Sequence, residues 1–335
     1  MSIVMTGGGT GGHLAIIKAV KEELGEENLI YIGSTKGQDK AWFGEDEQFS
    51  QKFFLDTQGV VNQGIFGKIK SLFMLLKATG EARKILKESK AKVVFCVGGF
   101  SAAPTSFAAK MLKIPLVIHE QNATIGSLNK LLRPYAKAFI SSYEEDSPIH
   151  AYPIKREFFE KSHIRDEIKT VIFLGGSQGA MAINKLALDL IPILKEKNIN
   201  IIHQAGERNI DEVKHSYQDL GVEAEVFGFT TELSTYMQKA DFAIARAGAS
   251  TLWELSASAC PTLFIPYPYA SGDHQYHNAK FLTKQNVAWL TREEDIEIGE
   301  IIKILESNMK TKSEKLQKMI ESDGALQIAT LLKSF

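Results

Sequence analysis

The chain has 335 residues, 44% of them hydrophobic, with 39 Lys and Arg against 40 Asp and Glu. At roughly 100–200 residues per domain this length predicts two domains, and the mixture is that of a globular protein rather than a disordered, collagen-like or coiled-coil chain. A net charge of −1 is unlike the basic surface that nucleic-acid binding requires, so we expect no nucleic-acid partner.

The cysteine count and the hydropathy pattern indicate the cellular compartment in which the protein works. The 2 cysteines, Cys96 and Cys260, stand among apolar residues and are too few for a disulfide framework, which indicates a reducing environment. Residues 1–5 run straight into glycines, without the charged and apolar regions of a signal peptide. The long uncharged stretch 93–109 is broken by glycine and proline, unlike a spanning helix of about 20 apolar residues. We expect a cytoplasmic protein, with attachment to a membrane surface left open.

Short apolar runs alternate with amphipathic stretches along the chain, as in parallel α/β sheets. Helical patterns at 14–24 and 69–88 separate the first runs, and another lies near the end at 325–332. The predicted strands are 3–5, 29–32, 93–97, 115–118 and 138–141, then 170–174, 200–204, 224–227, 242–245 and 262–266.

This pattern starts twice. Ser-Ile-Val-Met-Thr-Gly-Gly-Gly at 2–9 parallels Thr-Val-Ile-Phe-Leu-Gly-Gly-Ser at 170–177, each a strand that runs into a glycine turn. We therefore predict two Rossmann-like domains facing a central cleft, with a junction near 151–153. The first half carries a small excess of positive charge, which favours an anionic partner there.

The first glycine segment, 6–13, has the features of an anion-binding turn. Glycines between a strand and a helix let backbone N–H groups approach a ligand, and the helix dipole favours negative charge. Gly7, Gly9 and Gly12 match the dinucleotide spacing, but 33–36 offers no ribose-binding acid. At the helix start His13 is either a neutral base or a capping histidine, and a purely structural turn remains an alternative.

Two more polar segments follow strands of the first half. The loop 98–104, with Ser101, is either a binding loop or a structural turn. His-Glu-Gln-Asn at 119–122 follows a strand directly, at the edge where parallel sheets bind ligands. It lacks the spacing of a zinc site, so hydrogen bonding is expected.

The second half has corresponding turns. The glycine loop 175–179 lacks the P-loop lysine, so Ser177 is expected to contact a phosphate or ribose. The N–H groups of 249–251 begin a helix and suit a diphosphate. One turn on, Glu254 either holds a ribose or forms a capping box with Thr251. Gln275, in the polar loop 272–279, is a natural sugar or phosphate ligand.

Together these segments predict an anionic, nucleotide-bearing donor on one domain and an acceptor on the other. The chain shows no P-loop, pair of catalytic carboxylates or Asp-x-Asp motif. Helix N-termini can hold a diphosphate by themselves, so we expect no metal and no cofactor.

The motifs closely resemble those of the MurG family of bacterial N-acetylglucosaminyltransferases, from residue 6 to about 278. The matching segments are 8–13, 98–100, 119–122, 175–179, 246–249 and 273–275, with Glu254. The resemblance implies an inverting transferase of the GT-B fold. It implies UDP-GlcNAc as donor and lipid I, the undecaprenyl-diphosphate-linked muramyl pentapeptide, as acceptor. The product would be lipid II for peptidoglycan synthesis, and with it cell shape and division.

The resemblance also implies roles for domains and residues. The second domain, 154–319, would bind UDP-GlcNAc, and the first, 1–153 with 320–335, would bind the acceptor and face the membrane. Implied donor contacts are Thr10, Gly11, Gly12, Asn122, Lys155, Ser177, Thr230, Ala249, Ser250, Thr251, Leu252, Glu254 and Gln275. Implied acceptor contacts are Gly9, His13, Gly99, Phe100 and Ser101.

The implied base for the muramyl 4-hydroxyl is His13, with Glu120 as the rival. An unperturbed histidine titrates at about 6.5, which suits proton transfer near neutral pH.

Three segments depart from the family pattern. Ile16 and Ile17 stand where proline and glycine are usual. The junction 151–155 reads Ala-Tyr-Pro-Ile-Lys in place of Gly-Asn-Pro-Val-Arg, so Lys155 or Arg156 must replace the arginine. The stretch 59–68 lacks the usual basic, glycine-rich character.

The segment 65–77 is apolar with interspersed lysines. Helical spacing puts Ile65, Ile69, Leu72, Phe73 and Leu76 on one stripe, which predicts a core-facing side. Off that stripe, Phe66, Met74 and Leu75 would leave apolar surface beside Lys68, Lys70 and Lys77. Such a surface suits an interfacial segment, so we hypothesise peripheral attachment here, on the cytoplasmic side of the cell's inner membrane.

Other functions remain alternatives. A nicotinamide oxidoreductase would use the first glycine spacing, but it lacks the ribose-binding acid and leaves the second glycine loop unexplained. A UDP-GlcNAc epimerase or a sensor of sugar nucleotides would need no lipid acceptor. A glycolipid synthase acting on diacylglycerol has similar loops without the 119–122 cluster.

Overall fold

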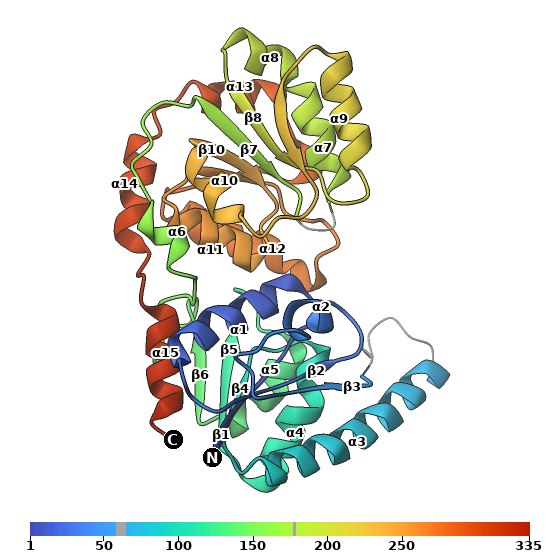
Figure 1. Ribbon diagram of the computed structural model, residues 1–335. Coiled ribbons are helices and arrows are strands. Elements are labelled where there is room, and N and C mark those ends of the chain that lie inside the picture. The colour runs from blue at the N-terminus through green and yellow to red at the C-terminus, as the bar shows by residue number, and fades with distance from the viewer. Residues whose placement is uncertain (58–64, 177–178) are drawn as a thin grey trace. The chain divides into compact units, whose positions relative to one another are not determined.

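The computed structural model divides the chain into two units (Figure 1). Unit 1 comprises Met1–Lys155 and Asp323–Phe335, and unit 2 comprises Arg156–Ser322. The structure describes residues 1–57, 65–176 and 179–335, with only the backbone of 65–69. Ser177 and most of the departing stretch 59–68 therefore lie outside the described residues.

Unit 1 is built on a parallel sheet of order β3-β2-β1-β4-β5-β6. Its strands are β1 (Ser2–Thr6), β2 (Leu29–Ser34), β3 (Gln51–Leu55), β4 (Ala91–Cys96), β5 (Leu116–Glu120) and β6 (Ala138–Ser141). Its helices are α1 (Gly11–Leu24), α2 (Asp39–Phe43), α3 (Ile65–Glu88), α4 (Ala103–Leu112), α5 (Ser127–Leu132) and α15 (Gly324–Lys333), with 3-10 turns η1 (Phe100–Ala102) and η2 (Arg133–Tyr135).

Apolar strands explain this sheet. Every residue of β1 and β2 is buried, as parallel strands covered on both faces require. One face packs on α3 and α4 through small side chains such as Ala78, Ala82 and Ala108. The helices α1 and α15 contact each other, so the end of the chain completes unit 1.

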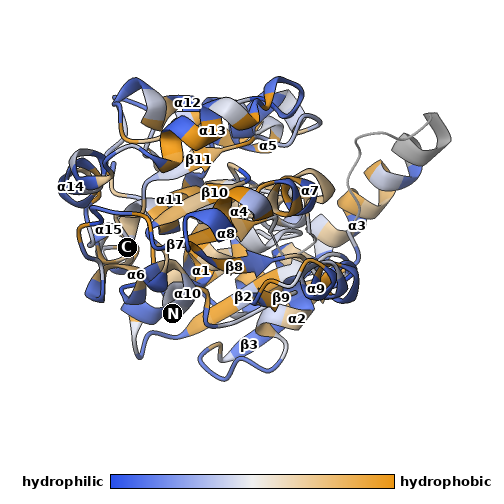
Figure 2. Cartoon of the chain, turned by 90° about the horizontal axis from the view of Figure 1, so that it is seen from above, coloured by the Kyte–Doolittle hydropathy of each residue, from blue (hydrophilic) through white to orange (hydrophobic). Residues whose placement is uncertain are grey.

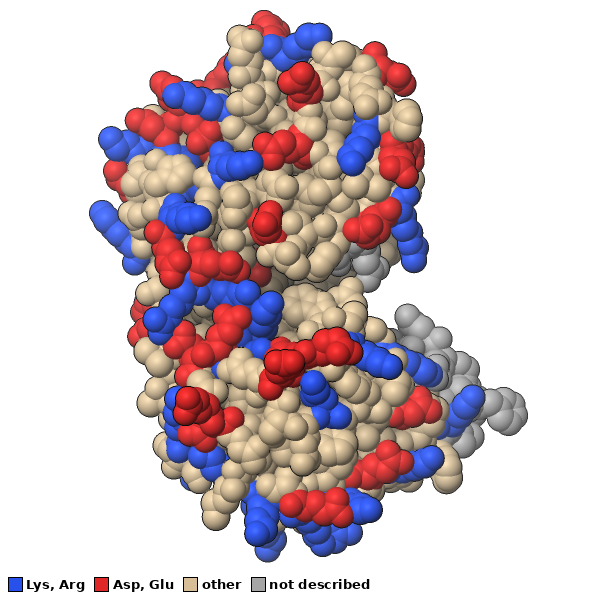
Figure 3. All heavy atoms as spheres, viewed as in Figure 1, with Lys and Arg blue, Asp and Glu red and all other residues tan. Residues whose placement is uncertain are grey.

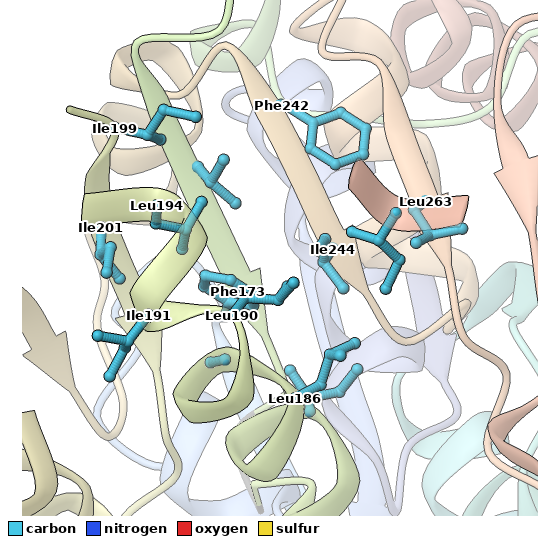
Figure 4. Close-up of a cluster of buried hydrophobic side chains, with 14 of the residues drawn as sticks. Phe173, Leu186, Leu190, Ile191, Leu194, Ile199, Ile201, Phe242, Ile244 and Leu263 are labelled. Carbon is cyan, nitrogen blue, oxygen red and sulfur yellow. The ribbon is translucent and has the colours of Figure 1, made fainter. Parts of the chain in front are cut away.

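Unit 2 repeats the plan with the order β12-β11-β10-β7-β8-β9. Its strands are β7 (Thr170–Leu174), β8 (Asn200–Gln204), β9 (Ala224–Phe227), β10 (Phe242–Ala245), β11 (Thr262–Phe264) and β12 (Trp289–Leu290). Its helices are α6 (Glu157–Glu160), α7 (Met181–Asp189), α8 (Ile191–Glu196), α9 (Ile210–Asp219), α10 (Leu233–Lys239), α11 (Ala249–Ala257), α12 (His274–Lys284), α13 (Ile298–Leu305) and α14 (Lys310–Met319), with η3 (Ser271–Asp273) and η4 (Glu293–Asp295). Figure 4 shows one side of its core, where Phe173, Phe242 and Ile244 meet side chains of α7 and α8.

The two parallel sheets confirm the predicted Rossmann-like α/β class, and every predicted strand is present. Sequence analysis missed β3 and β12. Both are edge strands: β3 begins with the polar Gln51 and Lys52, and β12 has only 2 residues, so neither shows the continuous apolar run that marks a central strand. Figure 2 shows apolar colour concentrated on the central strands, and Figure 3 shows acidic and basic side chains interspersed on one face.

The predicted orientation of 65–77 is wrong where side chains are described. Leu72, Phe73 and Leu76, assigned to the core, are 55%, 71% and 63% exposed, whereas Met74 and Leu75, assigned to the surface, are half-buried. The reason is that this part of α3 packs on α4 with small residues such as Ala78, so Leu72, Phe73 and Leu76 face outward. No helix among the described residues is long and apolar enough to cross a membrane.

Candidate active site

The glycine loop between β1 and α1 is tightly packed against its neighbours. Gly9 has φ 83°, and a Cβ on it would lie 2.7 Å from Cε1 of Phe100. Gly99 has φ 81°, and a Cβ there would lie 2.5 Å from the carbonyl oxygen of Gly8. Because both residues need the left-handed region and close approach, the two predicted loops form one structure.

Within that structure the implied acceptor contacts differ in accessibility. Gly9, Gly99 and Phe100 are partly exposed at the loop surface, and Phe100 lies against Gly9. Ser101 is completely buried, and its hydroxyl has no hydrogen-bond partner among the described residues. Ser101 therefore lies under the loop in this structure rather than on it.

A buried carboxylate that sequence analysis missed holds this loop. The Oδ2 atom of Asp39 accepts the N–H of Gly9 at 2.7 Å, and Oδ1 accepts the N–H of Ser34 at 3.0 Å. The Tyr31 hydroxyl lies 3.0 Å from Oδ1 and 2.8 Å from the carbonyl oxygen of Gly7. Burial, and secondarily the Asp39 charge, raises the pKa of Tyr31, so its proton stays in place. In the sequence Asp39 lies in a polar stretch typical of an exposed turn.

His13 is the third residue of α1, and both of its ring nitrogens have neighbours. Nδ1 lies 2.8 Å from Oγ1 of Thr10, the N-cap residue, and Nε2 lies 3.0 Å from Nε2 of Gln121. The first internal bond of the helix runs from Leu14 N–H to Thr10 O at 3.4 Å. The N–H groups of Gly11 and Gly12 precede that bond, so they are directed out of the helix end.

Glu120 is buried at the end of β5 and accepts three hydrogen bonds. Oε1 accepts the N–H of Asn122 at 3.0 Å, and Oε2 accepts the N–H of Gly126 and the Asn129 amide, each at 2.9 Å. These bonds hold the turn 121–126 and the start of α5. The geometry is that of a structural carboxylate.

His119, beside it, is completely buried and contacts the Tyr152 ring edge-on at 5.5 Å. Neither ring nitrogen has a hydrogen-bond partner among the described residues. Burial, with a smaller effect of His13, lowers the pKa of His119 to about 3, so the ring is neutral. Among the described residues no group of three His, Cys, Asp or Glu side chains is arranged to hold a metal ion.

In unit 2 the turn between β10 and α11 presents backbone N–H groups. Gly248 is the N-cap, and the first internal bond runs from Leu252 N–H to Gly248 O at 2.9 Å. The N–H groups of Ala249, Ser250 and Thr251 precede that bond and point out of the helix end. Leu252 is completely buried, so any ligand contact it makes is through its backbone.

Glu254 lies one turn further along α11 and is half-exposed. Its Oε1 accepts the hydroxyl of Ser250 at 3.1 Å. No side chain caps the start of α11, so the capping-box alternative with Thr251 is wrong.

The loops beside α11 are fixed by polar contacts. Arg246 donates to the carbonyl oxygens of Ile265 and Pro266 and pairs with Glu293 at 2.7 Å. Oε1 of Gln275 accepts the N–H of Tyr267 at 3.0 Å, which leaves its amide nitrogen as a donor. Thr230, in the loop after β9, accepts the N–H of Glu232 at 3.0 Å.

The junction residues differ in their surroundings. Lys155, the last residue of the first segment of unit 1, lies 3.6 Å from Glu22 of α1. Arg156, the first residue of unit 2, is exposed.

Family models match both halves of the chain. The glycosyltransferase family 28 N-terminal domain matches residues 3–141, and the family's C-terminal domain matches 170–333. A curated relative from Sulfurovum sp. is 65% identical over 335 residues, covering 100% of this chain and 99% of its own. One from Wolinella succinogenes is 49% identical over 336 residues, covering 100% of each. Both are named UDP-N-acetylglucosamine–N-acetylmuramyl-(pentapeptide) pyrophosphoryl-undecaprenol N-acetylglucosamine transferase.

Solved structures share the fold. MurG of Acinetobacter baumannii superposes with a TM-score of 0.79 at 26% identity, covering 100% of this chain and 99% of its own. An enzyme described as a putative UDP-N-acetylglucosamine 2-epimerase, from Listeria monocytogenes, has a TM-score of 0.65 at 10% identity, covering 99% and 95%. At that identity the second likeness shows the fold alone.

Proposed function

This chain belongs to the MurG family of glycosyltransferases, and we propose that it transfers N-acetylglucosamine from UDP-GlcNAc to the 4-hydroxyl of the muramyl sugar of lipid I, giving lipid II. The observation that carries the proposal is 65% identity to a curated transferase over the full chain. The reaction would serve peptidoglycan synthesis, and through it cell shape and division.

Unit 2 would bind the donor. The N–H groups at the start of α11 suit the diphosphate, because a helix N-terminus supplies directed donors and a positive dipole end. The Glu254 carboxylate suits the two ribose hydroxyls, and the Gln275 amide provides a further donor. Thr230 would lie near the uracil, and Ser177 would add a contact. In unit 1, the residues proposed to contact the donor are Thr10, Gly11, Gly12, Asn122 and Lys155.

Unit 1 would bind the acceptor, with its diphosphate at the glycine loop and His13 as the base. A base needs a lone pair for the substrate proton, and a neutral imidazole that donates from Nδ1 to Thr10 carries one on Nε2. In this structure the Gln121 amide nitrogen lies 3.0 Å from Nε2, and the substrate hydroxyl would take its place there. Glu120 serves less well, because its two oxygens already accept three hydrogen bonds inside the unit.

In the transfer step the muramyl oxygen attacks the anomeric carbon while Nε2 of His13 takes its proton. The bond from the anomeric carbon to the diphosphate oxygen breaks, and UDP leaves with the electron pair. One attack from the opposite side inverts the anomeric configuration. The helix N-terminus of α11 would stabilise the charge that grows on the leaving diphosphate.

A lipid-linked acceptor lies in a membrane, so the protein needs a surface that binds one. The exposed side chains of α3 in unit 1 suit such a surface. Leu72, Phe73 and Leu76 are exposed, and Met111 of the neighbouring α4 is 61% exposed. Lys70 and Lys77 are also exposed on α3. Apolar side chains beside lysines suit the boundary of an anionic bilayer, so peripheral attachment on the cytoplasmic side of the inner membrane is proposed through these residues.

The test is UDP release from UDP-GlcNAc, with and without a soluble lipid I analogue, in EDTA. We expect release only when the acceptor is present, and no loss with the chelator. Binding of UDP-GlcNAc without acceptor-dependent release would overturn the acceptor assignment. Interconversion of UDP-GlcNAc with its 2-epimer would instead favour the epimerase alternative.

A further inference from the structure

Asp39 is a completely buried carboxylate that has no role in the proposed reaction. It is 0% exposed, and its carboxylate accepts the N–H groups of Gly9 and Ser34 beside the Tyr31 hydroxyl. Burying a charge is costly unless every oxygen is satisfied, so a turn on the surface would gain nothing from it. This arrangement fixes the glycine loop against the end of β2.

We propose that Asp39 is a positioning residue that holds the proton-accepting histidine, His13, at its working place through the Gly9–Thr10 backbone. This inference rests on the proposed function for the identity of the reaction.

The connection from Asp39 to His13 is short. Gly9 is bonded to the carboxylate at 2.7 Å, and the next residue, Thr10, carries the hydroxyl that lies 2.8 Å from Nδ1 of His13. On the other side of the ring Gln121 lies 3.0 Å from Nε2. A shift of Gly9 therefore moves Thr10 directly, and with it the hydrogen bond that sets the ring orientation.

The same carboxylate decides which N–H groups an anion can reach. It takes the N–H of Gly9 inward, so the outward donors of the turn are those of Gly11 and Gly12. Neighbours of Asp39 also bound that turn: a Cβ on Gly11 would lie 3.2 Å from Oε1 of Gln38 and 3.5 Å from Cζ2 of Trp42. Asp39 thus fixes the loop and the wall beside it together.

An asparagine cannot replace this carboxylate, although it has the same shape. Asp39 presents an acceptor oxygen on each side, one to Gly9 and one to Ser34. An amide has a single oxygen, so its NH₂ group must face one of these two N–H donors. Two opposed donors repel each other, and one of the two backbone segments must move.

The experiment compares Asp39→Asn with Asp46→Asn. Asp46 is a matched control, because it is a mostly buried carboxylate of unit 1 that accepts the N–H of Gln48 and pairs with Lys21. Both variants are expected to melt at lower temperature. Only Asp39→Asn should lower kcat, by roughly tenfold to a hundredfold, the loss expected for about 1 Å of misplacement. The Kd for UDP should stay within about twofold in both, since the contacts proposed for its uracil, ribose and diphosphate lie in unit 2.

A second variant covers the case in which Asp39→Asn does not fold. Tyr31→Phe keeps the carboxylate and removes only a hydroxyl, which contacts Oδ1 of Asp39 and the carbonyl oxygen of Gly7. It should fold and lower kcat in the same direction by a smaller factor. The ¹⁵N chemical shifts of the His13 ring supply a readout that needs no substrate. We expect them to move in Asp39→Asn or Tyr31→Phe and to stay unchanged in Asp46→Asn.

The outcomes separate the two proposals. Equal kcat losses in the Asp39 and Asp46 variants, or unmoved His13 shifts in both Asp39→Asn and Tyr31→Phe, would overturn the positioning role. Absence of acceptor-dependent transfer in the unmodified protein would overturn the proposed function, while a His13 shift specific to Asp39→Asn would still support the contact chain.

Discussion

The turn before α1 and the turn before α11 use the same kind of backbone. Each turn follows a parallel strand that has a neighbouring strand on both sides, and each leads into a helix. The first N–H groups of that helix make no hydrogen bond within it. Their side chains differ. The turn of unit 1 rests on buried Asp39 and leads to His13, whereas that of unit 2 leads to Ser250 and Glu254 on the exposed side of the helix.

This difference separates two tasks. A helix N-terminus is enough to bind an anion. The mostly buried charge of the turn before α11, Arg246, pairs with Glu293 and donates to the carbonyl oxygens of Ile265 and Pro266. Holding a reacting group within a fraction of an ångström needs a second set of contacts. The turn before α1 receives them from Tyr31 of β2, from Asp39 of α2 and from the residues that follow β4 and β5. If the comparison is correct, changes in unit 1 should mainly alter kcat, and changes in unit 2 should mainly alter donor binding.

His13→Ala should have the largest effect. Loss of a general base typically lowers kcat by roughly 10²–10⁴-fold, while UDP binding should not change. Acceptor-dependent UDP release and calorimetric titration with UDP measure the two quantities. A kcat within a few fold of the unmodified enzyme would assign the proton transfer elsewhere.

A buried histidine in unit 2 predicts a loss of stability in acid. His203 lies 3.0 Å from both the Tyr217 hydroxyl and Oδ1 of Asn184, and burial lowers the pKa of His203 to about 4. The unfolded chain, titrating at about 6.5, binds the proton first. Stability is therefore complete above pH 6.5 and falls as the pH approaches 4, by roughly 3 kcal/mol.

His203→Gln should remove this part of the pH dependence. Urea unfolding followed by tryptophan fluorescence, at several values between pH 4 and 7, measures it for the variant and the unmodified chain. Parallel curves for the two proteins would mean that His203 does not stay neutral in the folded state.

Glu120→Gln tests whether this carboxylate is structural or catalytic. An amide keeps one oxygen, so at least one of the three donors loses its acceptor, which costs about 1–3 kcal/mol of stability. The melting temperature should fall while kcat at 25 °C changes only a few fold. A kcat loss as large as that of His13→Ala, in a variant that is still folded, would make Glu120 the base.

Glu254→Ala should act on donor binding alone. Loss of hydrogen bonds to the ribose should raise the KM for UDP-GlcNAc by about tenfold, since a hydrogen bond to a charged group contributes about 1.5–3 kcal/mol. Ser250→Ala is the control, because it removes the hydroxyl that donates to Glu254 and leaves the carboxylate in place. A loss confined to kcat would contradict the division between the two turns.

The smallest effect is expected at the membrane. Phe73→Glu with Leu76→Glu should weaken binding to anionic vesicles by roughly tenfold, because two apolar side chains no longer enter the bilayer boundary. Turnover of a soluble acceptor should not change. Leu220→Glu, at a 51% exposed leucine of unit 2, is the control. If the double variant and the Leu220→Glu control float with vesicles equally well, α3 is not part of the membrane-binding surface.

Much of the fold could be predicted because its signals are local. The central strands are short apolar runs that end in glycines, and these runs need no knowledge of their partners. The edge strands β3 and β12 were missed because β3 begins with the polar Gln51 and Lys52 and β12 has only 2 residues, so neither forms a recognisable apolar run. The predicted orientation of α3 was wrong because periodicity identifies the apolar stripe of a helix but does not tell which of its faces a neighbouring helix, here α4, covers.

The sequence by itself determined that two strand–glycine–helix patterns exist, that His13 stands at the start of one helix and Glu254 in the other, and which family these motifs resemble. Only the tertiary structure decided how the polar groups pair. His13 contacts Gln121, which lies 108 residues further along the chain, and Asp39 binds Gly9, which lies 30 residues before it. The pairing of two polar groups far apart in the chain depends on how the strands between them are ordered in the sheet, and no local pattern of residues encodes that order.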